Sequence, residues 1–585
     1  MLRRFKRNGS LTAAVLLSGV LSTWLAAGSA RAYDPAKPEA ATATAAAVQT
    51  TVVAGRREMV VTANAHATRA AQAMLAAGGT AIDAALAAQW MLGLVEPQSS
   101  GIGGGAFMLY WDAKAQTLTA WDGRETAPHK AGADFARKPD GTLARFDEIV
   151  PTGKSVGTPG VVAMLAAAHG AHGRLPWTQS FDAAIALAEA GFAVSPRLAA
   201  LLGKNATLPS RADTRALFYR PDGTPRTVGE RLATPALAAS YRQLAAGGAA
   251  AFHRGPLARV MAAAVQARGG LLSEADLAAY APRRREAVCG AFRAYRVCSM
   301  PPPSSGGIAV LQLLGIYAAS GGADDPDGID ATHRFLEAGR LAFADRARYV
   351  ADPDFIAVPQ ARLLDADYLA HRAALIDPQR AMGRAAPGEL GMPAAYAALN
   401  GDAPATTHLS IVDAEGNALA MTSSVEGAFG SGILVEGFLL NNQMTDFSFA
   451  GEREGVPLAN RLEPGKRPLS SMAPTLVFDA DGALQAVLGS PGGPHIIGFV
   501  AQTLVALLDG RQAPERAVAA PRRGNRNGAS EFEAGAPAAI TDALAARGHA
   551  IGRIEVPSGL ALIVRDGEGW RGVADPRREG MAAGR

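Results

Sequence analysis

Hydrophobic and polar residues follow periods that change along the chain, and these periods predict its secondary structure. An apolar run at residues 59–62 is typical of a strand, and residues 65–77 continue with helical spacing. A second helix is predicted to begin near Ala81. Helical patterns then dominate residues 160–266 and 307–349.

Strand-like runs occur in pairs, which predicts hairpins. Residues 106–110 and 118–121 flank one turn, and residues 415–417 (Glu-Gly-Asn) form another between alternating runs. Two more runs of strand length lie at residues 474–478 and 484–488. Mixed helices and antiparallel hairpins indicate an α+β fold.

The N-terminal segment has the pattern of a targeting signal. Arginines and a lysine within residues 3–7 precede an apolar stretch at residues 11–27, and Ala30-Arg31-Ala32 gives a small-x-small cleavage pattern. We expect cleavage after Ala32, a disordered mature N-terminus at residues 33–57, and export to the periplasm or the medium. No later stretch is long and apolar enough to suggest a membrane span.

The chain holds two cysteines, Cys289 and Cys298, in a segment that reads as a hairpin turning at Arg293-Ala294. That turn places Cys289 opposite Cys298, and an oxidising compartment permits a disulfide between them. Two buried, reduced thiols are the alternative. Metal binding is not expected, because no histidine lies nearby in the sequence.

Composition narrows the function classes. The 585 residues are 49% hydrophobic, with 65 Gly and 36 Pro, which is ordinary for a globular protein. A net charge of +4 does not indicate a nucleic-acid partner, and the clusters Arg283–Arg285 and Arg522–Arg523 are predicted to be solvated surface. The glycine run at residues 101–105 lacks the framing of a phosphate-binding loop and instead predicts close backbone packing.

Thr406 begins the most informative segment. Turn residues 401–404 lead abruptly into Thr406-Thr407-His408 and a predicted strand. A threonine hydroxyl is a weak nucleophile without a base, but cleavage between Ala405 and Thr406 would create an adjacent α-amino group. By itself this tripeptide is more often plain strand.

Six further motifs occur in a fixed order around it. They are Gly101-Ile102-Gly103-Gly104-Gly105, Asp122-Gly123-Arg124-Glu125-Thr126-Ala127-Pro128, Met300-Pro301-Pro302-Pro303-Ser304-Ser305-Gly306-Gly307, Asn441-Asn442-Gln443-Met444-Thr445-Asp446-Phe447, Lys466-Arg467-Pro468-Leu469-Ser470-Ser471-Met472 and Gly489-Ser490-Pro491-Gly492-Gly493. Together with Thr406, this series resembles the γ-glutamyltranspeptidase family of N-terminal-nucleophile hydrolases, from about Met59 to the C-terminus.

The resemblance implies one large domain with a four-layer αββα sandwich. It also implies a precursor that cleaves itself at Ala405-Thr406 into a large subunit, residues 58–405 with the N-terminal segment, and a small subunit, residues 406–585. The expected activity is hydrolysis or transfer of a γ-glutamyl group from glutathione and related amides to water, amino acids or peptides. No cofactor is implied.

Site roles follow from the resemblance, residue by residue. Thr406 is the expected nucleophile, Ser424 contacts its new amino group, and Gly492 and Gly493 form the oxyanion hole. The residues expected to bind the substrate carboxylate or ammonium are Arg124, Ser470, Ser471, Gln443 and Asp446. His408 shares a strand face with Thr406 and is as well explained as a core histidine as it is as a base.

Two departures from the family pattern affect specificity. Glu426 stands where the family generally has asparagine in the amino-group pocket. It is still counted among the substrate-binding residues, because its carboxylate can bind an ammonium, and it would repel a ligand that lacks an amine. The segment between Asp446 and Ser470 is short and contains no tyrosine, so a reduced lid and an open cleft are expected. These departures keep a glutaryl or cephalosporin-type acylase of the same superfamily as an alternative. A secreted binding protein on an inactive scaffold is a second alternative, and transfer onto peptides is a third.

Overall fold

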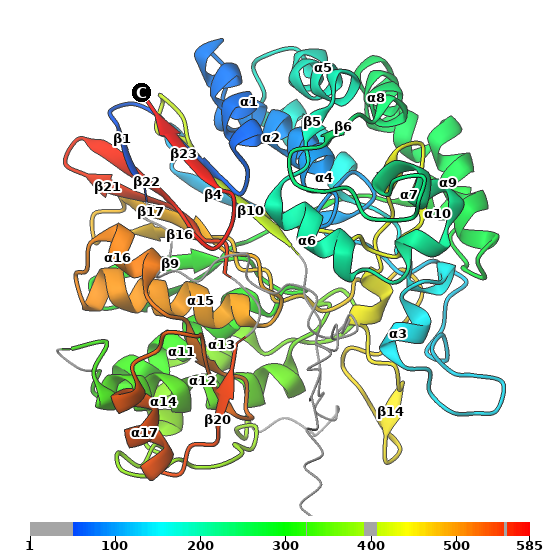
Figure 1. Cartoon of the computed structure of the whole chain (residues 1–585). Coiled ribbons are helices and arrows are strands. Elements are labelled where there is room, and N and C mark those ends of the chain that lie inside the picture. Colours follow the sequence, from blue (N-terminus) through cyan, green and yellow to red (C-terminus); the bar gives the residue numbers. More distant parts are fainter. Residues whose placement is uncertain (1–50, 323–324, 391–405, 555–557) are drawn as a thin grey trace, which may run out of the picture. The chain divides into compact units, whose positions relative to one another are not determined.

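The structure is a computed structural model of the chain (Figure 1). It describes residues 51–322, 325–390, 406–554 and 558–585. Contacts divide the chain into residues 1–32 and residues 33–585, and all described residues belong to the second unit. The predicted signal peptide and Ala405 therefore lie outside the described residues. Within the described part, no helix is both long and apolar enough to cross a membrane.

Two seven-stranded sheets organise this unit, and neighbouring strands in both are antiparallel. In spatial order the first sheet contains β1 (Val52–Gly55), β22 (Gly569–Ala574), β21 (Ala561–Asp566), β17 (Leu484–Gly489), β16 (Thr475–Phe478), β9 (Tyr295–Ser299) and β8 (Val288–Phe292). The second contains β23 (Met581–Gly584), β2 (Met59–Thr62), β10 (Thr407–Val412), β11 (Ala418–Ser424), β3 (Gly105–Asp112), β4 (Thr117–Gly123) and β7 (Arg283–Arg285).

The two sheets face each other, with β10 and β11 against β17, and helices pack on their outer sides (Figure 1). The group on the side of the second sheet comprises α1 (Ala65–Ala76), α2 (Ala81–Val95), α4 (Val161–His172), α5 (Asp182–Ala190), α6 (Pro196–Lys204), α7 (Ala212–Phe218), α8 (Pro235–His253), α9 (Pro256–Gln266) and α10 (Glu274–Ala279). The group on the side of the first sheet comprises α11 (Gly306–Ala319), α12 (Ile329–Tyr349), α13 (Gln360–Leu363), α14 (Ala366–Ala373), α15 (His495–Leu504), α16 (Pro514–Ala519) and α17 (Ala538–Ala546). The predicted four-layer αββα arrangement is confirmed.

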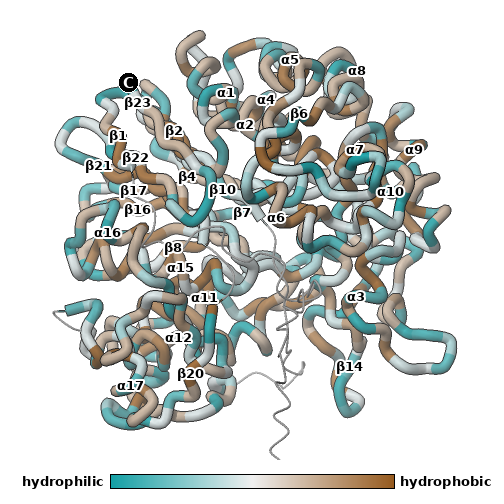
Figure 2. Tube along the Cα trace, viewed as in Figure 1, coloured by the Kyte–Doolittle hydropathy of each residue, from teal (hydrophilic) through white to brown (hydrophobic). Residues whose placement is uncertain are grey.

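Strand β10 illustrates why the sequence folds this way. Leu409 and Ile411 point into the core under the helices, whereas Val412 belongs to the core between the sheets. Both faces of β10 are buried, so the polar Ser410 is also inside and donates a hydrogen bond from Oγ to the Ala561 carbonyl at 2.9 Å. Figure 2 shows the contrast between such hydrophobic strands, β16 and β17 among them, and polar outer loops such as the one carrying β14 (Glu452–Arg453).

Local signals explain the first helices. The Asn64 side chain accepts a hydrogen bond from His66 N at 2.9 Å and so caps α1, which is followed by Gly78 at φ +87°. Thr80 and Asp83 form a capping box at the start of α2. The predicted helix starts at residues 65 and 81 are confirmed.

The cysteine hairpin is also confirmed. Cys289 is opposite Cys298 in the β8–β9 register, and the two sulfur atoms are bonded. The turn places Arg293 at φ +56°. A disulfide here ties together two neighbouring strands at the edge of the first sheet.

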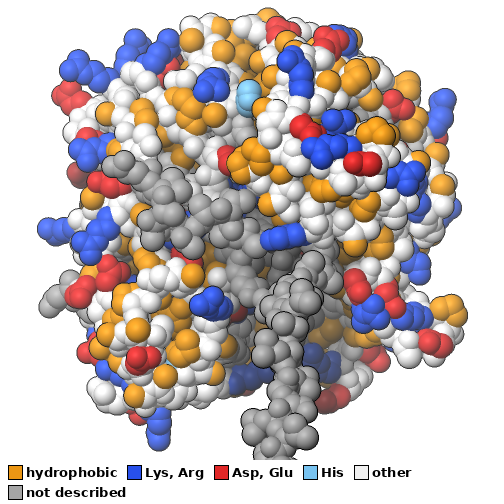
Figure 3. All heavy atoms as spheres, viewed as in Figure 1, with side chains coloured by type: hydrophobic (Ala, Val, Ile, Leu, Met, Phe, Trp, Pro, Cys, Tyr) orange, Lys and Arg blue, Asp and Glu red, His pale blue; other side chains and the backbone are white. Residues whose placement is uncertain are grey.

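Two predictions need correction. Disorder was expected up to residue 57, but Val52–Gly55 forms β1 and pairs with β22, because the sheet edge satisfies its backbone polar groups. The arginine clusters are not uniformly solvated surface: Arg285 forms an ion pair with Asp122 at 2.7 Å, and Arg522 is fully buried. Charged residues of both signs are interspersed on the face shown in Figure 3.

Candidate active site

One pocket gathers the predicted site residues from distant parts of the chain. All of them except Gly492 contribute to its wall, and Gly492 immediately precedes a wall residue. The pocket is lined by Arg124, Arg346, Thr406, Ser424, Glu426, Gln443, Asp446, Leu469, Ser470, Ser471, Met472, Gly493, Pro494 and Ile496. No described residue between 447 and 468 contributes to this wall, and the reduced lid stays a prediction.

Thr406 lies at the start of β10, beside the end of β11. Its Oγ1 is 3.4 Å from the Oγ of Ser424, and Ser424 Oγ accepts a hydrogen bond from the backbone N–H of Glu426 at 2.9 Å. Thr406 is only 3% exposed, so little bulk water competes for its hydroxyl. Ser424 thus lies beside the predicted nucleophile, and its contact with the new amino group stays a prediction.

His408 is a core residue. It is fully buried, its Nδ1 lies 2.8 Å from Thr422 Oγ1, and its Nε2 lies 3.2 Å from Ser410 Oγ. Burial lowers its pKa to about 3, so the ring is neutral at physiological pH. A side chain on Gly489 would strike this ring, since a Cβ there would lie 2.2 Å from His408 Cε1. The structural alternative for His408 is therefore the correct one.

Arg124 is buried, and two of its guanidinium nitrogens donate hydrogen bonds. Nη2 donates to Asp446 Oδ2 at 2.5 Å and to the Leu469 carbonyl at 2.8 Å, and Nε donates to the Pro468 carbonyl at 3.2 Å. Arg124 is expected to bind the α-carboxylate of the substrate and Asp446 its α-ammonium, and here these two residues form an ion pair with each other. In this structure the two charges neutralise each other.

Glu125 lies behind Arg124. Its Oε2 is 3.6 Å from Arg124 Nη1, and a side chain on Gly105 would collide with its carboxyl group. Complete burial raises the pKa of Glu125 to about 8, partly offset by Arg124. Glu125 is therefore predominantly protonated at neutral pH and leaves Asp446 as the anionic partner of Arg124.

Glu426, which departs from the family pattern in residue type, also has an unusual backbone conformation. Its φ is +79°, a region that residues with a side chain rarely adopt, and the cost is about 1 kcal/mol or more. Its carboxylate accepts a hydrogen bond from Asn442 Nδ2, while Gln443 Nε2 donates to Asp446 Oδ2 at 3.2 Å. The strained backbone directs a second carboxylate toward the pocket that Asp446 also lines.

Arg346, on α12, is a pocket residue that the sequence predictions did not include. Its Nε donates to Ser305 Oγ at 2.7 Å and its Nη2 donates to Ser471 Oγ at 2.9 Å. Ser305 Oγ in turn donates to the Ser470 carbonyl at 2.6 Å. The available signal was helical spacing, because Arg346 follows buried Ala338 and Ala342 at intervals of four residues.

The glycine loop before α15, predicted to form the oxyanion hole, has a backbone that favours glycine. Gly492 and Gly493 have φ values of +130° and +54°, and a Cβ on Gly492 would lie 2.7 Å from the Phe499 ring. The loop leads directly into the first turn of α15, where backbone N–H groups and the helix dipole favour negative charge.

The earlier glycine run packs beneath the site as predicted. A Cβ on Gly103 would lie 2.1 Å from the Leu439 carbonyl oxygen, and one on Gly104 would lie 2.1 Å from that of Ser424. Among the described residues no three His, Cys, Asp or Glu side chains converge as a metal site would require.

Known proteins resemble this chain along most of its length. A sequence model of the family described as "Gamma-glutamyltranspeptidase" matches residues 67–585. A "Glutathione hydrolase proenzyme" of Bacillus subtilis (strain 168) is 35% identical over 549 residues, covering 91% of this chain and 92% of the relative. The protein of that name from Escherichia coli (strain K12) is 38% identical over 485 residues, covering 80% and 81%.

Acylases are similar too. An "Acylase ACY 1 proenzyme" of Pseudomonas sp. (strain V22) is 36% identical over 538 residues and covers 89% of this chain and 93% of its own. The crystal structure of a cephalosporin acylase from Bacillus halodurans superimposes with a TM-score of 0.81 at 28% identity, covering 92% of this chain and 97% of that one. With the family match spanning residues 67–585 and the N-terminal-nucleophile hydrolase fold in place, this chain belongs to the γ-glutamyltranspeptidase family.

Proposed function

We propose that this protein is a γ-glutamyl hydrolase and transferase that acts through Thr406 after cleaving its own chain. The observation that carries the proposal is the pocket in which Thr406 meets the Arg124–Asp446 pair. A γ-glutamyl donor presents an α-carboxylate and an α-ammonium at one end, and these two charges fit an arginine and an aspartate held side by side.

Processing is the first stage. Thr406 Oγ1 attacks the Ala405 carbonyl carbon, the peptide C–N bond breaks, and the chain is held as an ester. Water hydrolyses the ester, which leaves a carboxylate on Ala405 and a free α-amino group on Thr406. The products are the large subunit ending at residue 405 and the small subunit, residues 406–585.

Turnover is the second stage. The Thr406 α-amine takes the proton of the hydroxyl as Oγ1 attacks the γ-carbonyl, and the oxyanion that forms is stabilised by the backbone N–H groups of Gly492 and Gly493, worth about 3 kcal/mol. The leaving amine departs with that proton. Water or an acceptor amine then releases the γ-glutamyl group from the ester.

Substrate charge distinguishes this function from that of the acylase relatives. A glutaryl group lacks the α-ammonium, so it offers no partner for Asp446 or Glu426, both in the pocket wall. We therefore favour γ-glutamyl amides over glutaryl amides as donors. Small-molecule donors, an exported protein and a signal peptide at residues 1–32 complete the proposal.

The test begins with purified full-length protein on a denaturing gel, with intact-mass analysis. Two fragments are expected, the smaller one beginning at Thr406, and Thr406→Ala should give one uncut, inactive chain. Processed, active Thr406→Ala protein would refute the nucleophile, and an uncut wild-type chain would favour an inactive binding protein. Matched γ-glutamyl and glutaryl anilides then decide the donor: a higher kcat/KM for the glutaryl compound would support the acylase alternative.

A further inference from the structure

Arg578 contacts the proposed nucleophile from a distant part of the sequence. It lies between β22 and β23, and its Nη1 donates a hydrogen bond to the backbone carbonyl of Thr406 at 3.0 Å. The side chain is buried, at 6% exposure, and does not belong to the wall of the pocket. A buried cation outside the pocket wall therefore binds the backbone of the proposed nucleophile.

The Arg578 side chain also packs on Gly559, which contacts the loop that contains the predicted oxyanion-hole residues. A Cβ on Gly559 would lie 2.5 Å from Arg578 Cδ and 2.7 Å from Pro491 Cγ, so both groups rest on this glycine. Gly559 N also donates to Ser490 Oγ at 3.1 Å. Through Gly559, Arg578 connects the carbonyl of Thr406 with the loop that contains Gly492 and Gly493.

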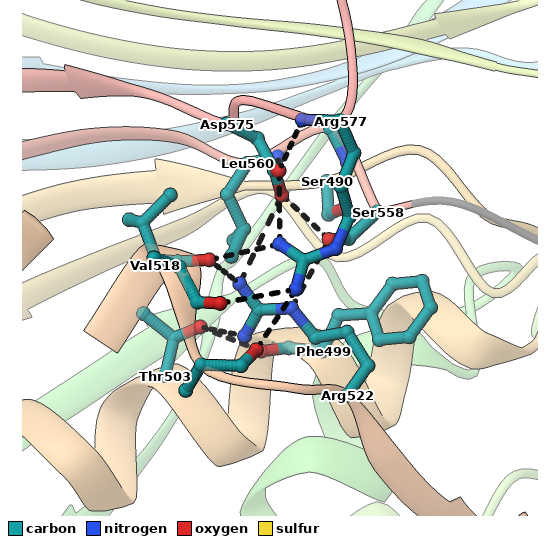
Figure 4. Close-up of polar contacts among 12 residues, drawn as sticks. Ser490, Phe499, Thr503, Val518, Arg522, Ser558, Leu560, Asp575 and Arg577 are labelled. Atoms are coloured by element: carbon teal, nitrogen blue, oxygen red, sulfur yellow. Dashed lines mark hydrogen bonds and ion pairs between the residues drawn. The ribbon is translucent and has the colours of Figure 1, made fainter. Parts of the chain in front are cut away.

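A polar cluster fixes both segments that make this connection (Figure 4). Asp575 accepts hydrogen bonds from Ser558 Oγ at 2.5 Å, from Leu560 N at 3.2 Å and from Arg577 Nη1 at 3.0 Å. Arg522 Nε also donates to Ser558 Oγ, at 3.0 Å. Residues 558–560 and 575–577 are thus held together, and Gly559 and Arg578 with them.

We propose that Arg578 is a positioning residue that fixes Thr406 relative to the oxyanion loop and keeps its α-amino group in the neutral, proton-accepting form. This inference rests on the proposed function, because the α-amino group exists only after processing. Its first part follows from the hydrogen bond and from the shared packing on Gly559.

The second part follows from charge. A cation bound to the carbonyl of Thr406 disfavours a second positive charge on the neighbouring amino group and so lowers its pKa. The other charged groups around Thr406 are mixed in sign. In the pocket wall these are Arg124, Arg346, Glu426 and Asp446; behind Thr407, they are Glu96, which accepts from Thr407 Oγ1 at 3.3 Å, and its ion-pair partner Arg197.

The experiment compares Arg578→Gln and Arg578→Lys in the full chain with wild type. Arg571→Gln is the matched control, because Arg571 is a partly exposed arginine on β22 that pairs with Asp566 at 2.7 Å. The readouts are the rate of precursor conversion on gels and the pH profile of kcat/KM with a γ-glutamyl anilide.

For Arg578→Gln we expect slower conversion, a kcat lower by roughly 10- to 100-fold with a nearly unchanged KM, and an acidic limb moved up by about one pH unit. Arg578→Lys keeps the charge but loses the planar fork, so its limb should stay at the wild-type pH while kcat falls at least about fivefold. Arg571→Gln should match wild type.

If Arg578→Gln has the wild-type kcat and the acidic limb of its kcat/KM pH profile is unchanged, the inference is overturned. If that variant is insoluble, a wild-type kcat in Arg578→Lys would overturn it equally. An uncut or inactive wild type, with Arg571→Gln behaving the same way, would instead identify a failure of the proposed function itself.

Discussion

Two groups of buried charges in this molecule differ in how they are neutralised. In the pocket, Arg124 pairs with Asp446, whose side chain is 15% exposed. In the C-terminal cluster of Figure 4, Arg577 pairs with Asp575, whose side chain is 1% exposed. The first pair lines a pocket, whereas the side chains of the second are almost completely buried.

In the C-terminal cluster the arginines are also bound by backbone carbonyls, which are fixed in place by the fold. Arg577 Nη1 donates to the Val518 carbonyl at 3.1 Å, and Arg522 Nη1 donates to that of Ala517 at 3.3 Å. Burial next to Arg577 lowers the pKa of Arg522 to about 9. Buried charge alone therefore does not identify a binding site. A buried ion pair is a candidate only where it lines a pocket, so that a charged group of a substrate could replace one of the partners.

The largest effect on stability is expected for Asp575→Ala. It leaves Arg522 and Arg577 with less compensating charge, and the free energy of unfolding should fall by about 4 kcal/mol. Urea denaturation of the purified variant measures this loss. A loss below about 1 kcal/mol would show that the cluster is not a rigid support.

The matching change in the pocket is Asp446→Asn. We expect kcat/KM for a γ-glutamyl anilide to fall by about 100-fold, because a charge-assisted contact to the ammonium is lost. The stability loss should be smaller than for Asp575→Ala, because the Asp446 side chain is 15% exposed and solvent can reach the pair. The glutaryl anilide should be affected far less. Equal losses for both anilides would contradict the assignment of Asp446 to the ammonium.

Glu125 sharpens the comparison through pH. Its pKa is raised to about 8 in the folded protein, so the folded state retains a proton that the unfolded state has already lost above its ordinary pKa of 4.5. Stability should therefore fall as pH rises through this window, by about 1.4 kcal/mol per pH unit, and level off above pH 8. Glu125→Gln should remove this contribution, and unfolding at pH 6 and pH 7 tests it; an equal slope in both proteins would refute it.

The smallest effect concerns Glu426. Replacing it by asparagine removes one pocket carboxylate and places a residue that tolerates positive φ at +79°. We expect the γ-glutamyl to glutaryl ratio of kcat/KM to fall by about tenfold or less, with stability unchanged or a few tenths of a kcal/mol higher. A rise in that ratio would show that Glu426 opposes the donor.

The residues of the candidate site that lie in motifs could be predicted from the sequence. Thr406, Arg124, Asp446 and the serine pair each belong to a recognisable run, and the strands around them follow a period of two. Arg346 and Arg578 were not predicted, because their contacts with the site arise only where segments distant in the sequence meet. The burial of Arg522 was missed for the same reason, since nothing in Pro521-Arg522-Arg523 distinguishes a core arginine from a surface one.

The strand order of the two sheets has a consequence for the order in which the protein folds and is cleaved. Both sheets contain strands from before and after residue 405: β2 lies between β23 and β10, and β1 lies at the edge of the first sheet beside β22. Once the proposed cut is made, neither fragment retains a complete sheet of its own. We therefore expect the intact chain to fold before it is cut. After the cut the two fragments are no longer covalently linked, so we expect separated fragments to reassemble less readily than the precursor folds.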